Sequence, residues 1–175
     1  VSGESLSLTG SGVLGAASAG TQTVTNNNTL AIANGTGLAS NYTLSGATIN
    51  VTVIPRALNV TLSREYDGTT VVSGASLTPT FDSLQGGETL ALSGTGSVST
   101  ANVGSSKAVT LGTIALAAGS GNPNNYTLNT ANMNVSQRVI NLDGIRAYDA
   151  TTNVLSSDIT TFGNIVSGET LTISG

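Results

Sequence analysis

The stretch ALNVTLSREYDGTT at residues 57–70 decides the fold, because it joins a strand pattern to a turn pattern. Apolar and polar residues alternate at Leu58, Val60 and Leu62, which is the period of two that turns one face of a β-strand toward a core. Tyr66-Asp67-Gly68 follows, and Asp-Gly is typical of a turn. The stretch therefore predicts a half-buried strand that ends at a turn.

The same alternation recurs along the chain, in short runs separated by clusters of Gly, Asn and Ser. Examples are Leu90 and Leu92, Val109 and Leu111, Ile114 and Leu116, and Ile49, Val51 and Val53. No stretch has sustained helical periodicity. We predict an all-β fold of small antiparallel β-sandwich units, either immunoglobulin-like or β-grasp-like. A parallel β-solenoid is a weaker alternative, because its coils are much shorter than the repeat found in this sequence.

A long internal repeat is the strongest signal in the sequence. Residues 3–51 align with residues 87–135 without a gap, and 20 of the 49 aligned positions are identical. A second alignment places Arg64 on Arg146 and Tyr66-Asp67 on Tyr148-Asp149. Further along, Gly87-Glu88 matches Gly168-Glu169 only if one residue has been deleted from the later copy. The sequence therefore predicts tandem units of about 82 residues.

The phase of the repeat divides the 175 residues into three parts. Residues 57–138 form one complete unit, here called the central unit. Residues 1–56, the back segment, correspond to the later part of a unit, and residues 139–175, the front segment, to the earlier part. The phrase VSGE occurs in both, at 1–4 and 166–169. Each segment alone would expose apolar faces and strand edges with little charge to protect them, so we expect head-to-tail completion by a covalent neighbour or by a separate subunit. The alternative is a domain boundary near VSGE, which would give two self-contained units.

Composition excludes several classes of function. Five basic residues and a net charge of −4 do not suit nucleic-acid binding, and no window resembles a membrane span. Cys and His are absent, so the sequence predicts no thiolate or imidazole metal site, and we expect neither a metal nor a cofactor. We also expect that the protein is not an enzyme.

The most conspicuous site residues occur twice, which favours a structural role over a catalytic one. Carboxylate and hydroxyl pairs could serve acid–base chemistry, but an active site is rarely copied into each repeat. A buried Tyr that ties a strand end to nearby backbone, as in the tyrosine corner of β-sandwiches, explains the recurrence better. The residues of this repeated motif are Arg64, Tyr66, Asp67, Arg146, Tyr148, Asp149, Asn41, Tyr42, Asn125 and Tyr126.

The motifs and their order resemble a known family. Arg64 before YDGTT (66–70), GGETLALSGTGS (86–97), NVG (102–104) and NYTL (125–128) are together similar to YDG-type repeats. These occur, with related MBG-type repeats, in large bacterial surface adhesins of the filamentous-haemagglutinin, two-partner-secretion kind. The second copy departs from the pattern, since it has YDATT at 148–152.

The resemblance implies export to the cell surface and a stalk built from many β-units. We expect a structural repeat segment of an extracellular adhesin, surface filament or biofilm matrix, whose partners are neighbouring repeats or other copies. The alternative is a module that binds glycans or matrix polysaccharide. Such a site would lie where the copies differ, for example at Lys107, which replaces Thr23.

Overall fold

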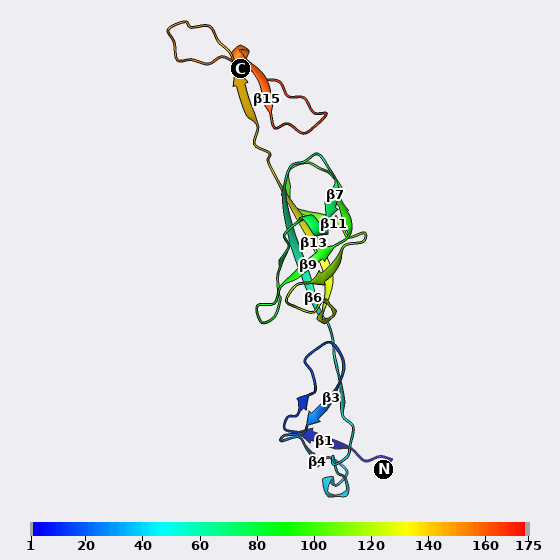
Figure 1. The fold of residues 1–175 in the computed structure, drawn as a ribbon. Helices are drawn as coiled ribbons and strands as arrows, with labels where there is room; N and C mark the ends of the chain where they lie inside the picture. Colours follow the sequence, from blue (N-terminus) through cyan, green and yellow to red (C-terminus); the bar gives the residue numbers. More distant parts are fainter. Residues whose placement is uncertain (1, 174–175) are drawn as a thin grey trace. The chain divides into compact units, whose positions relative to one another are not determined.

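The computed structural model describes residues 2–173 and confirms the all-β expectation (Figure 1). The longest helical elements among these residues are single turns of three residues. Contacts divide the chain into two compact units, Val1–Ala57 with Ser120–Thr127, and Leu58–Gly119 with Leu128–Gly175. The three-part division inferred from the repeat remains a prediction.

The back segment contains a two-stranded and a three-stranded sheet. Its elements are β1 (Leu6–Thr9), β2 (Val13–Leu14), β3 (Gly20–Asn26), β4 (Ala31–Asn34), the single turn η1 (Ala39–Asn41) and β5 (Asn50–Val53). β1 pairs with β4, and the second sheet has the order β2-β3-β5. Both sheets are antiparallel.

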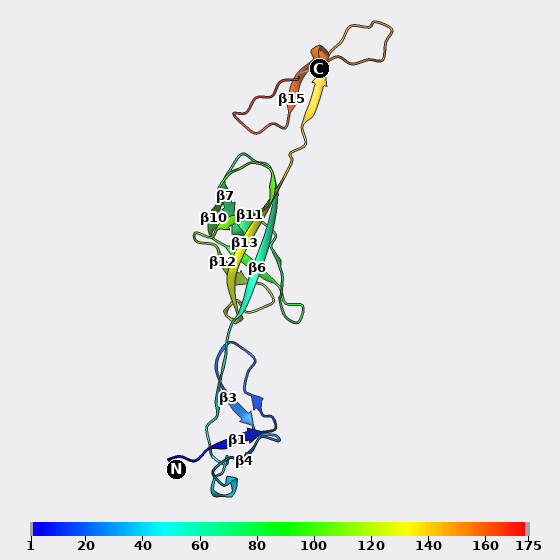
Figure 2. The same cartoon turned by 180° about the vertical axis from the view of Figure 1, so that it is seen from behind.

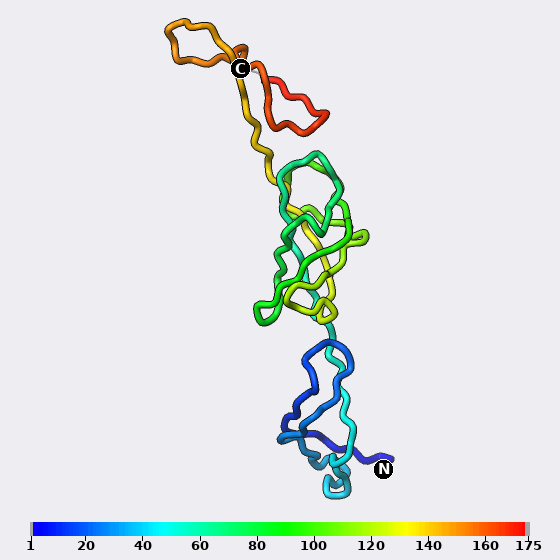
Figure 3. The backbone as a smooth tube through the Cα atoms, in the orientation of Figure 1, coloured from blue at the N-terminus to red at the C-terminus, as the bar shows by residue number. Residues whose placement is uncertain are grey.

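The central unit is built on a curled six-stranded sheet, whose order is β7-β10-β11-β13-β6-β8 (Figure 2). Its strands are β6 (Arg56–Glu65), β7 (Val71–Ser73), β8 (Thr80–Phe81), β10 (Thr95–Val98), β11 (Gly104–Thr110) and β13 (Tyr126–Ser136). An antiparallel pair, β9 (Leu90–Ser93) with β12 (Ala115–Ala118), forms a second small sheet. The turns η2 (Gly74–Ser76) and η3 (Pro123–Asn125) complete the unit, whose backbone is traced in Figure 3.

The core of this unit lies between the concave face of the large sheet and the β9–β12 pair. Leu58, Val60 and Leu62 on β6 are buried, as the alternation predicts. Other buried residues of this core are Val72, Leu90, Leu92, Val98, Ile114, Ala131, Met133 and Val135. Two sheets covering one apolar interior give the layered packing expected of a β domain.

One strand pair departs from the antiparallel pattern. The backbone N–H of Tyr66 donates to the carbonyl of Ser136, and the Asn59 side chain, earlier on the same strand, contacts Asn129 and Thr130. The neighbours β6 and β13 therefore advance in the same direction and pair in parallel. The rest of the unit, between Tyr66 and Tyr126, supplies the long crossover that parallel strands need.

The front segment contains β14 (Asn141–Gly144), the turn η4 (Ser156–Asp158) and β15 (Ile159–Gly163). The two strands pair antiparallel, with Leu142 opposite Phe162. In the central unit, Val60 on β6 is opposite Phe81 on β8, so the two strand pairs have the same register.

The repeat seen in the sequence also governs local structure. β1, β3, β4 and η1 have the same lengths as β9, β11, β12 and η3, and each begins at the residue that the gapless alignment matches. Gly94, after β9, has φ +76°, and a Cβ placed there would lie 2.0 Å from the carbonyl oxygen of Thr113. Gly10, after β1, has φ +82°, and its Cβ would be equally close to the carbonyl of Thr29. Only glycine fits this turn in either copy.

Candidate functional site

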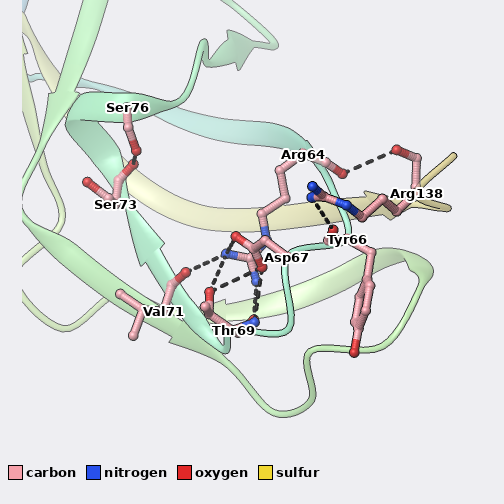
Figure 4. A network of polar contacts seen from close by, with 9 residues as sticks. Arg64, Tyr66, Asp67, Thr69, Val71, Ser73, Ser76 and Arg138 are labelled. Carbon is pink, nitrogen blue, oxygen red and sulfur yellow. Dashed lines mark hydrogen bonds and ion pairs between the residues drawn. The ribbon is translucent and has the colours of Figure 1, made fainter. Parts of the chain in front are cut away.

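The turn that follows β6 is organised by Arg64, whose side chain is 9% exposed (Figure 4). One guanidinium nitrogen donates to the backbone carbonyl of Val71 at 2.6 Å and to Oγ1 of Thr69 at 3.1 Å. The other donates to the Thr69 carbonyl. Arg64 therefore satisfies backbone acceptors on the far side of the turn and holds it against the strand end.

Asp67 stabilises the same turn by accepting hydrogen bonds from Thr69. Its Oδ1 accepts from the backbone N–H of Thr69 at 3.0 Å and from the Thr69 hydroxyl at 3.2 Å. Its other oxygen lies 3.3 Å from the Arg64 guanidinium. Gly68, between the two, has φ +75°, a conformation that glycine adopts without strain. We call the contacts among Arg64, Asp67 and Thr69 the arginine clamp.

The arginine clamp is present a second time in the front segment, with the same partners. Arg146 donates to the Thr151 hydroxyl at 3.2 Å, to the Thr151 carbonyl at 2.7 Å and to the Asn153 carbonyl. Asp149 accepts from the backbone N–H of Thr151 at 3.0 Å and from its hydroxyl at 2.9 Å. These two hydrogen bonds lower the pKa of Asp149 below its usual value, with the backbone bond as the larger cause. Ala150 replaces glycine there with φ +59°.

Tyr66 lies beside the clamp and does not have the role expected from the sequence. We expected a tyrosine hydroxyl that binds backbone, whereas the hydroxyl of Tyr66 donates to the carboxylate of Glu169. The backbone contacts at this strand end come instead from Arg64, and from Arg138, which donates to the Tyr66 carbonyl at 3.4 Å. Arg138 also pairs with Glu65 at 3.6 Å.

Tyr148, the counterpart of Tyr66, is 94% exposed, so the expectation of a buried tyrosine is wrong at this position, although the rest of its motif keeps the clamp geometry. The equivalent turns therefore differ in what covers the tyrosine ring. In the central unit, Tyr66 packs against the apolar core. The clamp therefore forms within a few residues of sequence, whereas the surroundings of Tyr66 come from the core and from front-segment residues such as Val166 and Leu171.

The two NYTL motifs occupy equivalent turns. The backbone N–H groups of Tyr42 and Tyr126 donate to the carbonyls of Ala39 and Pro123, respectively. The Tyr42 hydroxyl donates to Glu4 at 2.5 Å, and this bond raises the pKa of Tyr42 above its usual value. Tyr126 is buried, whereas Tyr42 is 36% exposed.

The asparagines of these motifs serve the backbone. Asn41 donates its N–H to the carbonyl of Leu38, and Asn125 donates to the carbonyl of Asn122. The side-chain oxygen of Asn125 also accepts from the N–H of Ala19 at 2.9 Å. The ten predicted motif residues are thus found at strand ends and turns, where most of them contact backbone. Sequence reasoning missed Glu169, whose signal was its identity with Glu4 and Glu88 in the repeated Gly-Glu pair.

Lys107 is the position at which the alternative, glycan-binding function would place a site. Its side chain forms hydrogen bonds within its own unit. Its ammonium group donates to Oγ1 of Thr100 at 2.8 Å and to the carbonyl of Asn102 at 2.6 Å. Lys107 therefore fastens the loop before β11. Among residues 2–173 there is no cluster of three acidic side chains suited to a metal ion. No helix in that range is long and apolar enough to cross a membrane.

Glu169 is expected to control the titration of Tyr66. The hydrogen bond from Tyr66 to Glu169 is the main cause that raises the Tyr66 pKa above its ordinary 10.0, with burial and the nearby negative charges adding to it. The hydrogen bond from Tyr66 to Glu169 therefore stabilises the folded protein fully at pH values below the pKa of Tyr66 in the unfolded chain. This stabilisation is lost as the pH rises through the higher pKa of Tyr66 in the folded protein. In an absorbance titration at alkaline pH, Glu169→Gln should lower the Tyr66 pKa.

The control for this titration is Asp143→Asn, which removes a charge that does not contribute to the Tyr66 shift. Tyr66→Phe identifies the signal, because it removes the one tyrosine that the experiment follows. If Glu169→Gln and Asp143→Asn left identical titration curves, the contact between Tyr66 and Glu169 would not exist in solution.

Comparison with known protein families identifies a YDG domain at residues 54–133, which span nearly all of the central unit. Neither the curated proteins nor the solved structures contain a significant match to the chain.

Proposed function

We propose that this chain is a structural repeat segment of an extracellular bacterial adhesin or surface filament, where it acts as stalk and scaffold. The observation that carries the proposal is the duplicated arginine clamp. Arg64 and Arg146, at equivalent positions of the repeat, use their guanidinium groups on the same set of turn acceptors. The terminal guanidinium nitrogens donate to their own turn, so they fix backbone geometry and have little capacity left for a ligand.

Three further features support a scaffold. A YDG domain covers most of the central unit, and the sequence order of its motifs resembles repeats of surface adhesins. The charged residues of the motifs face one another within the turns. Low charge and many Ser, Thr and Asn residues provide a surface that neighbouring repeats can cover without desolvating ions.

Electron microscopy of the intact protein, together with immunolabelling of cells, tests this function. We expect a thin fibre that is labelled on the outer cell surface by antibodies against the central unit. A compact particle, or label confined to the cell interior, would contradict the proposal. A glycan array with the chain checks the alternative, and we expect no bound sugar because Lys107 is committed to its loop.

A further inference from the structure

Arg138 lies in the linker between β13 and β14, and its guanidinium group contacts residues on both sides of that linker. Toward the front segment, Nε donates to the backbone carbonyl of Asn164 at 2.7 Å, and a terminal nitrogen donates to the Asn164 side-chain oxygen at 2.6 Å. Toward the central unit, the other terminal nitrogen donates to the Tyr66 carbonyl at 3.4 Å and lies 3.6 Å from the Glu65 carboxylate (Figure 4). One side chain therefore joins the turn held by the arginine clamp, here called the YDG turn (residues 65–70), to a turn of the following repeat.

Asn164 adopts a backbone conformation that suits this contact. Its φ of +63° lies in the left-handed region, which asparagine tolerates better than most residues. Its side-chain nitrogen donates to the Val139 carbonyl at 2.7 Å, and its side-chain oxygen accepts from Arg138. Because both polar atoms of the amide are bonded to the linker, Asn164 fixes the start of the front segment around Arg138.

An apolar contact accompanies the polar one. A Cβ placed on Gly68 would lie 2.8 Å from Cγ1 of Val166, so the absence of a side chain at Gly68 lets Val166 approach the YDG turn. Tyr66, Arg138 and Val166 also line the same pocket. The YDG turn and the front segment belong to one compact unit of the chain, and these residues supply a contact between them.

The positions that make this contact lie at the surface of a complete repeat. In the central unit, the counterparts of the linker and loop residues are exposed, namely Arg56 for Arg138, Ala57 for Val139 and Gln85 for Val166. A following repeat can therefore contact its neighbour through these positions without removing a side chain from its own core. Leu171, by contrast, corresponds to the buried Leu90, so we assign the contact to the linker and loop residues alone.

The repeat contains the elements of this contact more than once. An arginine precedes each unit, at Arg56 and Arg138, and the arginine clamp that shapes the YDG turn is present twice. The acceptor for Arg138 in the YDG turn is the backbone carbonyl of Tyr66. A backbone acceptor is retained when a side chain changes, so the contact does not depend on Glu65, which is replaced by Ala147 in the second copy.

We propose that the YDG turn is the docking surface on which one repeat holds the next, with Arg138 as the bridging side chain. The partner is the following repeat of the same chain, whose linker arginine binds the Tyr66 carbonyl and whose loop residue Val166 packs over Gly68. The arginine clamp then has a second role, because it fixes the turn that presents this carbonyl. Docking restricts the movement of the front segment relative to the YDG turn.

Distances between two spin labels, measured in the whole chain by double electron–electron resonance, test the bridge. Ala75→Cys in the central unit and Thr161→Cys in the front segment place the labels at exposed positions, and the chain has no other cysteine. We expect a narrow distance distribution that broadens with Arg138→Ala, because the side chain that spans the linker is lost. Arg138→Lys should restore only part of the narrow distribution, since one ammonium group cannot reproduce the forked geometry.

Arg56→Ala is the matched control, because it removes the same side chain from the same position of the repeat and leaves the contacts of Arg138 in place. Its distance distribution should remain as narrow as that of the unmodified chain. Circular dichroism of both variants establishes that the sheets remain folded. A broad distribution in the unmodified chain, no broadening with Arg138→Ala, or equal broadening with Arg56→Ala would each overturn the proposal.

A pair of steric variants tests the apolar part of the contact. Gly68→Ala adds the Cβ that meets Val166, so the mean distance between the labels should shift. The second copy of the turn already has alanine, at Ala150 with φ +59°, so the backbone of the turn accepts this residue. Val166→Ala in the same chain removes the colliding methyl group and should reverse the shift. No shift with Gly68→Ala, or a shift that persists with Val166→Ala, would contradict the contact.

Docking through the YDG turn extends the proposed scaffold function, but the two fail separately. Without docking, the stalk would consist of loosely joined repeats, and antibodies would still label a fibre on the outer cell surface. A protein found only inside cells would remove the adhesin function, while the measured contact between repeats would stand.

Discussion

Arg64→Ala should lower the free energy of unfolding of the central unit by about 3 kcal/mol, because it removes the donors that satisfy several turn acceptors at once. The carbonyls of Thr69 and Val71 lose their guanidinium partner, and Asp67 loses its nearby positive charge. Chemical denaturation followed by circular dichroism measures the change. Arg64→Lys should recover only part of the loss, since a single ammonium group cannot reproduce the forked geometry.

The second clamp supplies the matched control. Arg146→Ala removes the same set of contacts from a turn whose arginine is 29% exposed. Water can replace those hydrogen bonds, so the expected cost is below about 1 kcal/mol. Equal effects at Arg64 and Arg146 would contradict the view that burial makes the first clamp important for stability.

Leu62→Ala should cost about 3 kcal/mol or more, within the range measured for buried leucines that are replaced by alanine. Leu62 is fully buried, on the strand that lies between β13 and β8, and it contacts a core drawn from both sheets. The substitution leaves a cavity that strands held on both sides cannot easily close. Thermal and chemical unfolding both report the loss.

Leu155→Ala is the control for this substitution, because Leu155 is 63% exposed and its removal opens no cavity. Its expected effect on the monomer is within about 0.5 kcal/mol. A cost for Leu62→Ala that is no larger than that of Leu155→Ala would show that the core is not packed as described.

Much of the fold follows from the sequence, because alternation reports burial directly. Leu58, Val60 and Leu62 were expected on one face of a strand, and all three are buried. The parallel pairing of β6 with β13 could not be predicted in this way. Alternation shows which side of a strand faces the core but contains no information on the direction of its neighbour.

The same distinction between local patterns and long-range contacts applies to the candidate site. The turn at Tyr66-Asp67 was predictable from local residues, since an Asx turn needs only Asp67 and the backbone of Thr69. The contact of Tyr66 with Glu169 joins residues that are far apart in the chain, and no local pattern specifies such a pair. The Arg64 clamp lies between these cases, because its partners are only five and seven positions further along.

The parallel pair has a mechanical consequence. The chain enters the central unit through β6 and leaves it through β13, and these two strands are neighbours that run in the same direction. Tension applied to the chain at both ends therefore pulls the strands past each other along their length. Every hydrogen bond between them is loaded at the same moment, instead of opening one after another from an end. We expect a unit connected in this way to resist stretching until all the hydrogen bonds between the two strands fail together.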